Sequence, residues 1–250
     1  MKTLKSLEMG LMAILMCMNL ASCSNEESSY KDLILLVGES KTLEGTEVWK
    51  SDNVLIATVE GNKVVAIRKG ETFISSSNHS FKITVNATNN DFKEPYLKFG
   101  CNLSELKKEM NQFTVDTEID DAILYKGIGN VAYYMYGFKN QSLYLSCMLI
   151  PTSKMNNLVD FLSERYISVS ADEDDDYISM TNPEKDMVIL ISAQYLNNNY
   201  YYSVAYSNID SNPKGRSLGC NVLTDIFKEN TKNEDLQKKF TKDLYLQLNK

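Results

Sequence analysis

The chain has 250 residues, is 43% hydrophobic and carries a formal net charge of −7 at pH 7. This acidic balance makes nucleic acid and anionic membrane surfaces poor partners, because both are negatively charged. The length allows one large or two smaller packed domains, and a change of composition near residue 90 favours two.

The first 23 residues have the pattern of a secretion signal. Lys2 and Lys5 give a basic start, and an apolar run follows over Gly10–Leu20. This run is about half of the roughly 20 residues that a membrane-spanning helix needs. The segment Leu20-Ala21-Ser22-Cys23 resembles the lipobox of bacterial lipoproteins. The resemblance implies that residues 1–22 are a removed signal peptide and that Cys23 carries three acyl chains, enough for stable membrane attachment.

Residues 23–31 are polar and acidic, which predicts a flexible tether between the lipid and the fold. Glu26 and Glu27 resemble the acidic signal that, in one large group of Gram-negative bacteria, directs lipoproteins to the outer face. An ordinary soluble spacer is the alternative. The lipobox and the acidic signal together lead us to expect a protein that is anchored to the outer membrane through the lipid on Cys23 and faces outside.

Residues 32–88 show short runs of alternating apolar and polar residues separated by Gly, Asn and Asp. Such runs are typical of half-buried strands joined by tight turns and predict a small β-sandwich. Strands are expected at 33–37, 41–43, 47–50, 57–60, 63–67, 71–75 and 81–85.

The motifs Trp49-x-Ser51-x-Asn53, Ala57-Thr58-Val59 and Gly61-x-x-Val64 of this region are similar to the bacterial immunoglobulin-like domain, group 2. The resemblance implies an Ig-like spacer or adhesion module outside the cytoplasm and brings no catalytic residues with it. Trp49 is the only tryptophan, and a core position between two sheets is favoured over a role in sugar stacking.

A polar stretch before Pro95 predicts a domain boundary, and residues 94–210 then alternate helical and strand patterns. Asn102 followed by Glu105 predicts a helix start, and Pro151 with Ser153 precedes a second helical pattern. Strands are expected at 122–126, 131–138, 143–150, 166–170, 177–180, 187–193 and 200–207. This order predicts an α+β domain in which tandem α-β-β-β units share one antiparallel sheet with the helices on one face.

Residues 216–250 predict a helical C-terminal tail, with a short helix around residues 222–227 and a longer one that begins at Asn233. If Cys23 is lipidated, three cysteines remain in the mature chain, and this odd number argues against a disulfide framework. Cys101 and Cys147 are expected to be small buried apolar groups.

The sequence contains no motif that specifies a reaction or a cofactor. The one histidine, His79, lies in a Ser/Asn-rich turn and is expected to be an exposed loop residue. Alternate carboxylates at Asp172, Asp174 and Asp176 are candidates for calcium ligands, and a solvated acidic loop is the favoured interpretation.

Tyrosines provide the best candidate for a ligand-binding surface. Alternation along two expected strands places Tyr134 and Tyr136 on one side of the first, and Tyr200, Tyr202 and Tyr206 on one side of the second. If helices cover only the other face, these rings form a patch suited to a glycan or a protein ligand. The alternative is that they form the core beneath the helices.

Two classes of function compete on this evidence. The first is a non-catalytic binding or adhesion module for a glycan or protein ligand, held away from the membrane by the Ig-like spacer. The second is a carboxylate-dependent hydrolase of a surface polysaccharide, which needs only two suitably separated Asp or Glu residues. A purely structural envelope protein is a third possibility, and we favour the binding module.

Overall fold

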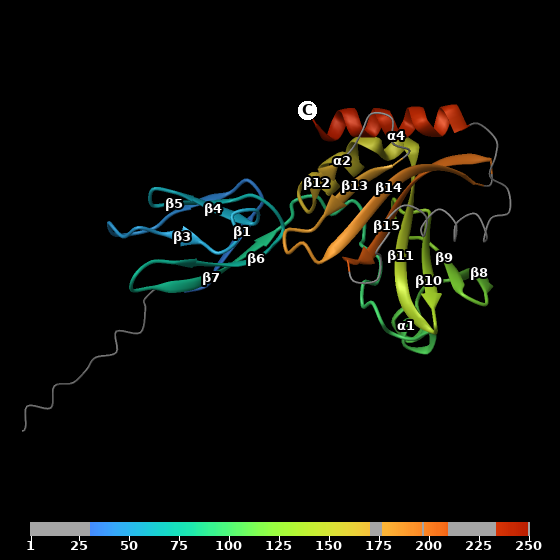
Figure 1. Ribbon diagram of the computed structural model, residues 1–250, viewed down its shortest axis with the longest axis horizontal. Coiled ribbons are helices and arrows are strands. Elements are labelled where there is room, and N and C mark those ends of the chain that lie inside the picture. Colours follow the sequence, from blue (N-terminus) through green and yellow to red (C-terminus); the bar gives the residue numbers. More distant parts are fainter. Residues whose placement is uncertain (1–30, 171–176, 197, 210–233, 250) are drawn as a thin grey trace, which may run out of the picture.

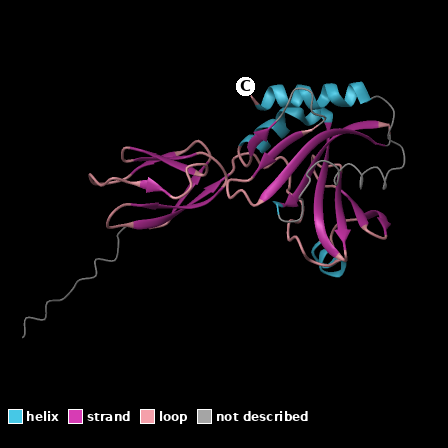
Figure 2. Cartoon of the chain, viewed as in Figure 1, coloured by secondary structure: helices cyan, strands magenta, loops and turns pink. Residues whose placement is uncertain are grey.

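The computed structural model describes residues 31–170, 177–196, 198–209 and 234–249. Over these residues the fold is mainly β, with three sheets and three α-helices (Figures 1 and 2). Figure 1 shows two small sheets on the left and one large sheet, which carries the helices, on the right.

The N-terminal part contains seven strands in two sheets. A four-stranded sheet has the order β1-β7-β6-β3 and a three-stranded sheet the order β2-β5-β4, with β1 parallel to β7 and all other pairs antiparallel. The strands are β1 Leu33–Leu36, β2 Ser40–Thr42, β3 Lys50–Ser51, β4 Ala57–Glu60, β5 Lys63–Ala66, β6 Gly70–Ser75 and β7 Ser80–Asn86. Six of the seven expected strands are present with small shifts of their ends, whereas the strand expected at 47–50 is reduced to the two-residue β3, which shares only Lys50 with it.

Apolar side chains from both small sheets form one core. Trp49 belongs to it, is 5% exposed and packs edge-on against Phe81 with ring centroids 5.6 Å apart. The structure thus confirms the predicted core position of the tryptophan. Large aromatic rings contribute much of the hydrophobic stabilisation of so small a core.

The C-terminal part is built on an eight-stranded antiparallel sheet with the order β12-β13-β14-β15-β11-β10-β9-β8. Its strands are β8 Val115–Ile119, β9 Ala122–Lys126, β10 Tyr133–Lys139, β11 Ser142–Pro151, β12 Ile167–Ser170, β13 Ile178–Thr181, β14 Met187–Leu196 and β15 Asn199–Asn208. The helices are α1 Leu103–Glu109, α2 Met155–Ser163 with a 3₁₀ turn η1 Thr152–Lys154 before it, and α4 Glu234–Leu248.

Four strands, β8 to β11, follow α1, whereas only three were expected there. Four strands, β12 to β15, also follow α2. The strand that the sequence pattern missed is β8, at the edge of the sheet. Its sequence, Val-Asp-Thr-Glu-Ile, carries two charges, and four of its five residues are exposed. Charged residues on an edge strand discourage pairing with other chains, and they also obscure the apolar alternation by which strands are predicted.

The three helices pack on one face of the large sheet, as expected. Leu106 of α1, Phe161 of α2 and Leu244 of α4 are fully buried in the same core as the side chains of that face. Figure 1 shows α2 and α4 together above strands β12 to β15. The opposite face carries a second buried cluster that includes Cys147. Both described cysteines, Cys101 and Cys147, are buried, as expected.

The two parts of the chain are joined by direct contacts around the end of α2. The backbone N–H of Lys69 donates to the carbonyl of Glu164 at 2.8 Å, and Nε of Arg68 donates to the carbonyl of Tyr166 at 3.3 Å. The carboxylate of Glu164 in turn accepts the backbone N–H groups of Thr88 and Asn89 at 2.7 and 2.9 Å. Hydrogen bonds therefore connect the N-terminal sheets, the linking segment and α2.

Candidate functional site

Four of the five tyrosines predicted to form a ligand-binding face are core residues in the structure. Tyr134, Tyr136, Tyr202 and Tyr206 are at most 1% exposed, and all four belong to the core beneath the helices. The expectation of an exposed aromatic patch is therefore corrected in favour of the alternative. Burial of these large rings beneath the helices contributes to the hydrophobic stabilisation of this part of the chain. Tyr200 is partly exposed and lies against Phe240 of α4, with ring centroids 5.2 Å apart.

Several other candidate residues lie outside the described part of the chain. These are Cys23, the expected lipidation residue, the calcium candidates Asp172, Asp174 and Asp176, and the expected helix around residues 222–227. Among the described residues, no group of three or more His, Cys, Asp or Glu side chains has the arrangement of a metal site.

His79 is partly exposed in its turn, but it has a carboxylate partner that the sequence did not indicate. Its Nδ1 atom lies 2.9 Å from Oε1 of Glu47, which is 32 residues away. The hydroxyl of Ser76 donates to the same carboxylate. The pKa of Glu47 is lowered, most strongly by the hydrogen bond from Ser76 and then by the contact with His79. The carboxylate of Glu47 thus contacts both the imidazole of His79 and the hydroxyl of Ser76.

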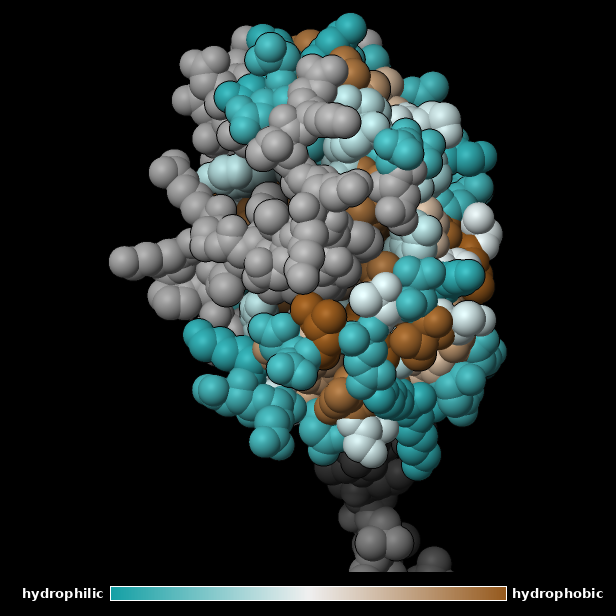
Figure 3. All heavy atoms as spheres, turned by 90° about the vertical axis from the view of Figure 1, so that its right-hand side faces the viewer, coloured by the Kyte–Doolittle hydropathy of each residue, from teal (hydrophilic) through white to brown (hydrophobic). Residues whose placement is uncertain are grey.

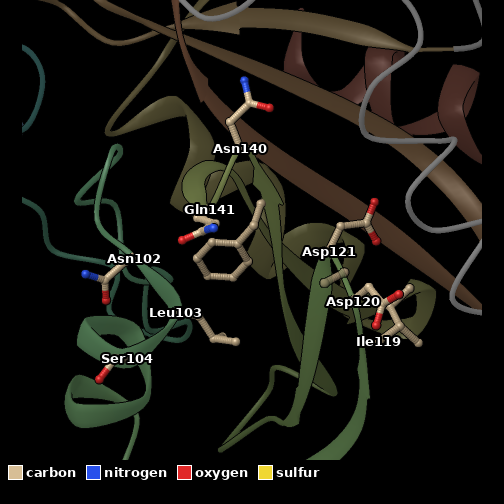
Figure 4. Close-up of a pocket in the computed structure, with 10 residues that line it drawn as sticks. Asn102, Leu103, Ser104, Ile119, Asp120, Asp121, Asn140 and Gln141 are labelled. Atoms are coloured by element: carbon tan, nitrogen blue, oxygen red, sulfur yellow. The ribbon is translucent and has the colours of Figure 1, made fainter.

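A pocket of about 550 Å³ lies where three chain segments meet at one end of the large sheet (Figure 4). The segments are the start of α1, the turn between β8 and β9, and the turn between β10 and β11. The volume falls within the range of about 300 to 1,000 Å³ that is typical of small-molecule sites. The ten lining residues are Asn102, Leu103, Ser104, Ile119, Asp120, Asp121, Ala122, Phe138, Asn140 and Gln141.

Backbone hydrogen bonds hold the first segment beside the β10–β11 hairpin. The N–H of Gly100 donates to the carbonyl of Leu143, and the N–H of Leu143 donates to the carbonyl of Cys101, both at 2.8 Å. Gly100 has a φ of +86°, a left-handed conformation that glycine adopts without a steric penalty. The helix then begins at once, because the side chain of Asn102 accepts the N–H of Glu105 at 2.9 Å and caps it as predicted.

The two hairpin turns are fixed in a similar way. The N–H of Phe138 donates to the carbonyl of Asp121 at 2.7 Å, which ties the β8–β9 turn to β10. Asn140 and Gln141 have φ values of 50° and 64°, so both occupy the left-handed region that a tight two-residue hairpin turn requires. Their side chains are exposed.

The lining of the pocket combines an apolar floor with a polar rim. Phe138, which is 8% exposed, contributes to the floor with Leu103 and Ile119. The rim carries amide, hydroxyl and carboxylate groups: Asn102, Ser104, Asp120, Asp121, Asn140 and Gln141. In Figure 4, Gln141 lies between Asn140 and Leu103, whereas Asp120 and Asp121 lie together on the side of Ile119.

The end of the molecule that bears β8 displays small hydrophobic areas between hydrophilic ones (Figure 3). Ile119 is 37% exposed at the pocket, and Val115 and Ile128 are 44% and 48% exposed nearby in the sequence. Scattered apolar residues of this kind are normal on a protein surface. The pocket differs from them because its apolar floor is surrounded by side chains that can donate and accept hydrogen bonds.

The pocket was not evident from the sequence. Asn102 was expected at the start of a helix and Phe138 in a strand, but Asp120, Asp121, Asn140 and Gln141 had no expected role. The available signal was the polar composition of two hairpin-length gaps between strands. Such gaps are polar in most proteins, so only the fold shows that these two meet a third segment.

No protein-family model matches the chain, and neither the comparison with curated proteins nor that with solved structures found a match. No described helix is both long enough and apolar enough to cross a membrane.

Proposed function

We propose that this protein is an outer-membrane lipoprotein, anchored through Cys23, that faces outside and binds a neutral glycan without cleaving it. The pocket between α1 and the two hairpin turns is the proposed binding site. A protein ligand is the alternative. The observation that carries the proposal is the lining of the pocket, in which an apolar floor lies beneath a rim of amides and carboxylates.

A sugar ring has the surface that this lining fits. Its faces expose C–H groups that pack on apolar and aromatic side chains such as Phe138 and Leu103. Its hydroxyl groups both donate and accept hydrogen bonds, and the rim offers carboxylates that accept and amides that do both. A purely apolar ligand would leave the rim groups without partners in the complex, which costs free energy.

The competing hydrolase would place its two carboxyl groups on either side of the bond that it cleaves, roughly 5 to 9.5 Å apart. The two carboxylates of this pocket, Asp120 and Asp121, are successive residues of one turn and lie on the same side (Figure 4). This arrangement favours binding over hydrolysis. In the proposed role, both carboxylates accept hydrogen bonds from sugar hydroxyls.

The rest of the chain fits a tethered binder. We propose that the two N-terminal sheets form the Ig-like β-sandwich that the sequence motifs resemble and act as a spacer above the membrane. Strands β8 and β9, whose connecting turn lines the pocket, lie on the side of the large sheet away from the N-terminal sheets (Figure 1). A ligand outside the cell can approach this side without passing the spacer.

The binding test uses the purified full chain and neutral hexose oligomers of one to six units. Gln141→Gly removes a rim side chain at a left-handed position where glycine is not strained. Asn198→Gly is the matched control, because Asn198 has a φ of 62° in the turn between β14 and β15. We expect binding by the wild type and the control, and a loss of about tenfold or more in affinity for Gln141→Gly. Equal affinities in all three proteins, or release of shorter sugars from the oligomers, would contradict the proposed role.

The anchor is tested on intact cells with a surface protease, alongside a Cys23→Ala variant. We expect the wild type to be membrane-bound and cleaved, and the variant to be lost from the membrane. A wild-type protein that is membrane-bound but protected from the protease would place it on the inner face instead.

A further inference from the structure

A second hollow lies directly beside the proposed site. It has a volume of about 490 Å³ and is lined by Phe99, Gly100, Lys139, Asn140, Ser142, Leu143, Tyr144 and Asn208. Asn140 lines both hollows, so the β10–β11 turn forms the boundary between them. In Figure 4 the side chain of Asn140 points away from Leu103 and Gln141, the side chains that belong to the first hollow alone.

The second hollow has the same kind of lining as the first. Phe99 and Tyr144 are partly exposed aromatic residues, and Lys139, Ser142 and Asn208 add polar groups. The backbone bonds that hold Gly100 and Cys101 against Leu143 place the wall of the second hollow next to the start of α1. One short stretch of chain, residues 99–104, therefore contributes to both hollows.

We infer that the two hollows bind consecutive units of one neutral oligosaccharide chain, which crosses the β10–β11 turn at Asn140. This inference rests on the proposed function and names its substrate class more closely. The first hollow holds one sugar unit between Phe138 and the rim amides, and the second holds the next unit or two against Tyr144.

The charges along this path favour a neutral chain. Asp120 and Asp121 line the first hollow, whereas Lys139 lines the second. A uniformly anionic polymer would meet the two carboxylates, and a uniformly cationic one would meet the lysine. Like charges brought together in this way cost binding free energy, so an uncharged polyhydroxyl chain suits both hollows better.

An extended peptide is less compatible with this surface. Peptides that bind to sheets pair with an open strand edge through their backbone. Strands β10 and β11 are already paired with each other up to the turn, through Lys139 and Ser142. Side chains thus form most of the lining of both hollows, together with the backbone of Gly100, and the nearby edge strand β8 carries charged residues that discourage pairing with another strand. A chain of sugar rings relies on side-chain contacts of this type.

The test measures affinity against ligand length, with the same hexose oligomers of one to six units and the purified full chain. Tyr144→Leu keeps an apolar side chain but removes the ring from the second hollow, and Lys139→Ala removes its cation. Lys126→Ala is the control for the lysine, because Lys126 is also an exposed residue at the end of a neighbouring strand. Gln141→Gly reports on the first hollow alone.

If one chain occupies both hollows, the wild-type affinity rises by about tenfold or more between one unit and three or four units. Tyr144→Leu and Lys139→Ala then remove most of this gain and leave the affinity for a single unit unchanged, whereas Gln141→Gly weakens binding at every length. An affinity that is independent of length, or second-hollow variants that behave like Lys126→Ala, overturns this inference and leaves the proposed function intact. Absence of binding at all lengths overturns both.

Discussion

Arg165 is joined to Asn89 by a hydrogen bond that spans 76 residues of the sequence, from Nη2 of the buried guanidinium to the backbone carbonyl, at 2.8 Å. Nη1 of the same group donates to the carbonyl of Phe161, and its Cζ atom lies 4.0 Å from the centre of the Phe161 ring. Glu94 lies 4.0 Å from its Nε atom. One side chain thus connects α2 to the segment between the two parts of the chain.

Replacement of this arginine is expected to be costly. Arg165→Met removes the hydrogen bonds to both carbonyls and leaves Glu94 with one cationic partner fewer, so we expect a loss of about 3 kcal/mol in the free energy of unfolding. Lys69→Met is the comparison, because Lys69 pairs with the same carboxylate but its side chain is 43% exposed. Its loss should stay below about 1 kcal/mol in urea denaturation. Equal losses in the two variants would show that the buried contacts of Arg165 have no special weight.

The lowered pKa of Glu94 predicts that the protein loses stability at acid pH. Burial opposes its ionisation, but the hydrogen bond and charge of Lys69, the hydroxyl of Tyr166 and the charge of Arg165 together lower its pKa. A carboxyl group with a lowered pKa stabilises the fold at neutral pH, and this stabilisation is lost as the pH falls through the folded-state pKa. Melting temperatures between pH 7 and pH 3 should therefore fall less steeply for Glu94→Gln than for the wild type. Parallel curves would show that Glu94 does not contribute to the acid sensitivity.

Two buried tyrosines predict a loss of stability at alkaline pH. Burial raises the pKa of Tyr134 and of Tyr202 to about 12, from an ordinary value of 10.0. The folded state keeps these protons at a pH where the unfolded chain releases them, so stability declines as the pH rises from about 10 through about 12. The double variant Tyr134→Phe, Tyr202→Phe should lose less stability between pH 9 and pH 11, as measured by urea denaturation. An unchanged decline would contradict this origin.

The cap of α1 supports one wall of the pocket. Asn102→Ala removes the side-chain oxygen that accepts the N–H of Glu105, with an expected loss of about 1 kcal/mol in the free energy of unfolding. Asn102→Asp keeps a capping oxygen and should retain most of that stability. Chemical denaturation measures the free energy of unfolding of both variants. Equal losses in Asn102→Ala and Asn102→Asp would show a general effect of substitution at this position and would contradict the role of the cap.

Local patterns were sufficient to predict most of the elements. The Asn102 cap, six of the seven strands of the N-terminal part and the core position of Trp49 each depend on residues close together in the sequence. The antiparallel sheet with helices on one face followed from the order of the elements. Strand β8 was missed because its charged residues hide the apolar alternation.

The candidate site depended on long-range information that no local pattern contains. The alternation that grouped Tyr134 with Tyr136 was correct, but an exposed face and a buried face of a sheet have the same period of two. The pocket requires residues 102, 120 and 140 to meet, and only the register of β8 to β11 and the contact of Gly100 with Leu143 bring them together.

The most direct test of the central claim is amide hydrogen exchange on the purified full chain, with and without the neutral hexose oligomer that binds most tightly. If the pocket and its neighbouring hollow bind the oligomer, exchange slows at residues 99–104, 119–122 and 138–144, and it stays unchanged at the β14–β15 turn beside Asn198. Slower exchange confined to the N-terminal sheets, with no change at these three segments, would contradict the proposed site.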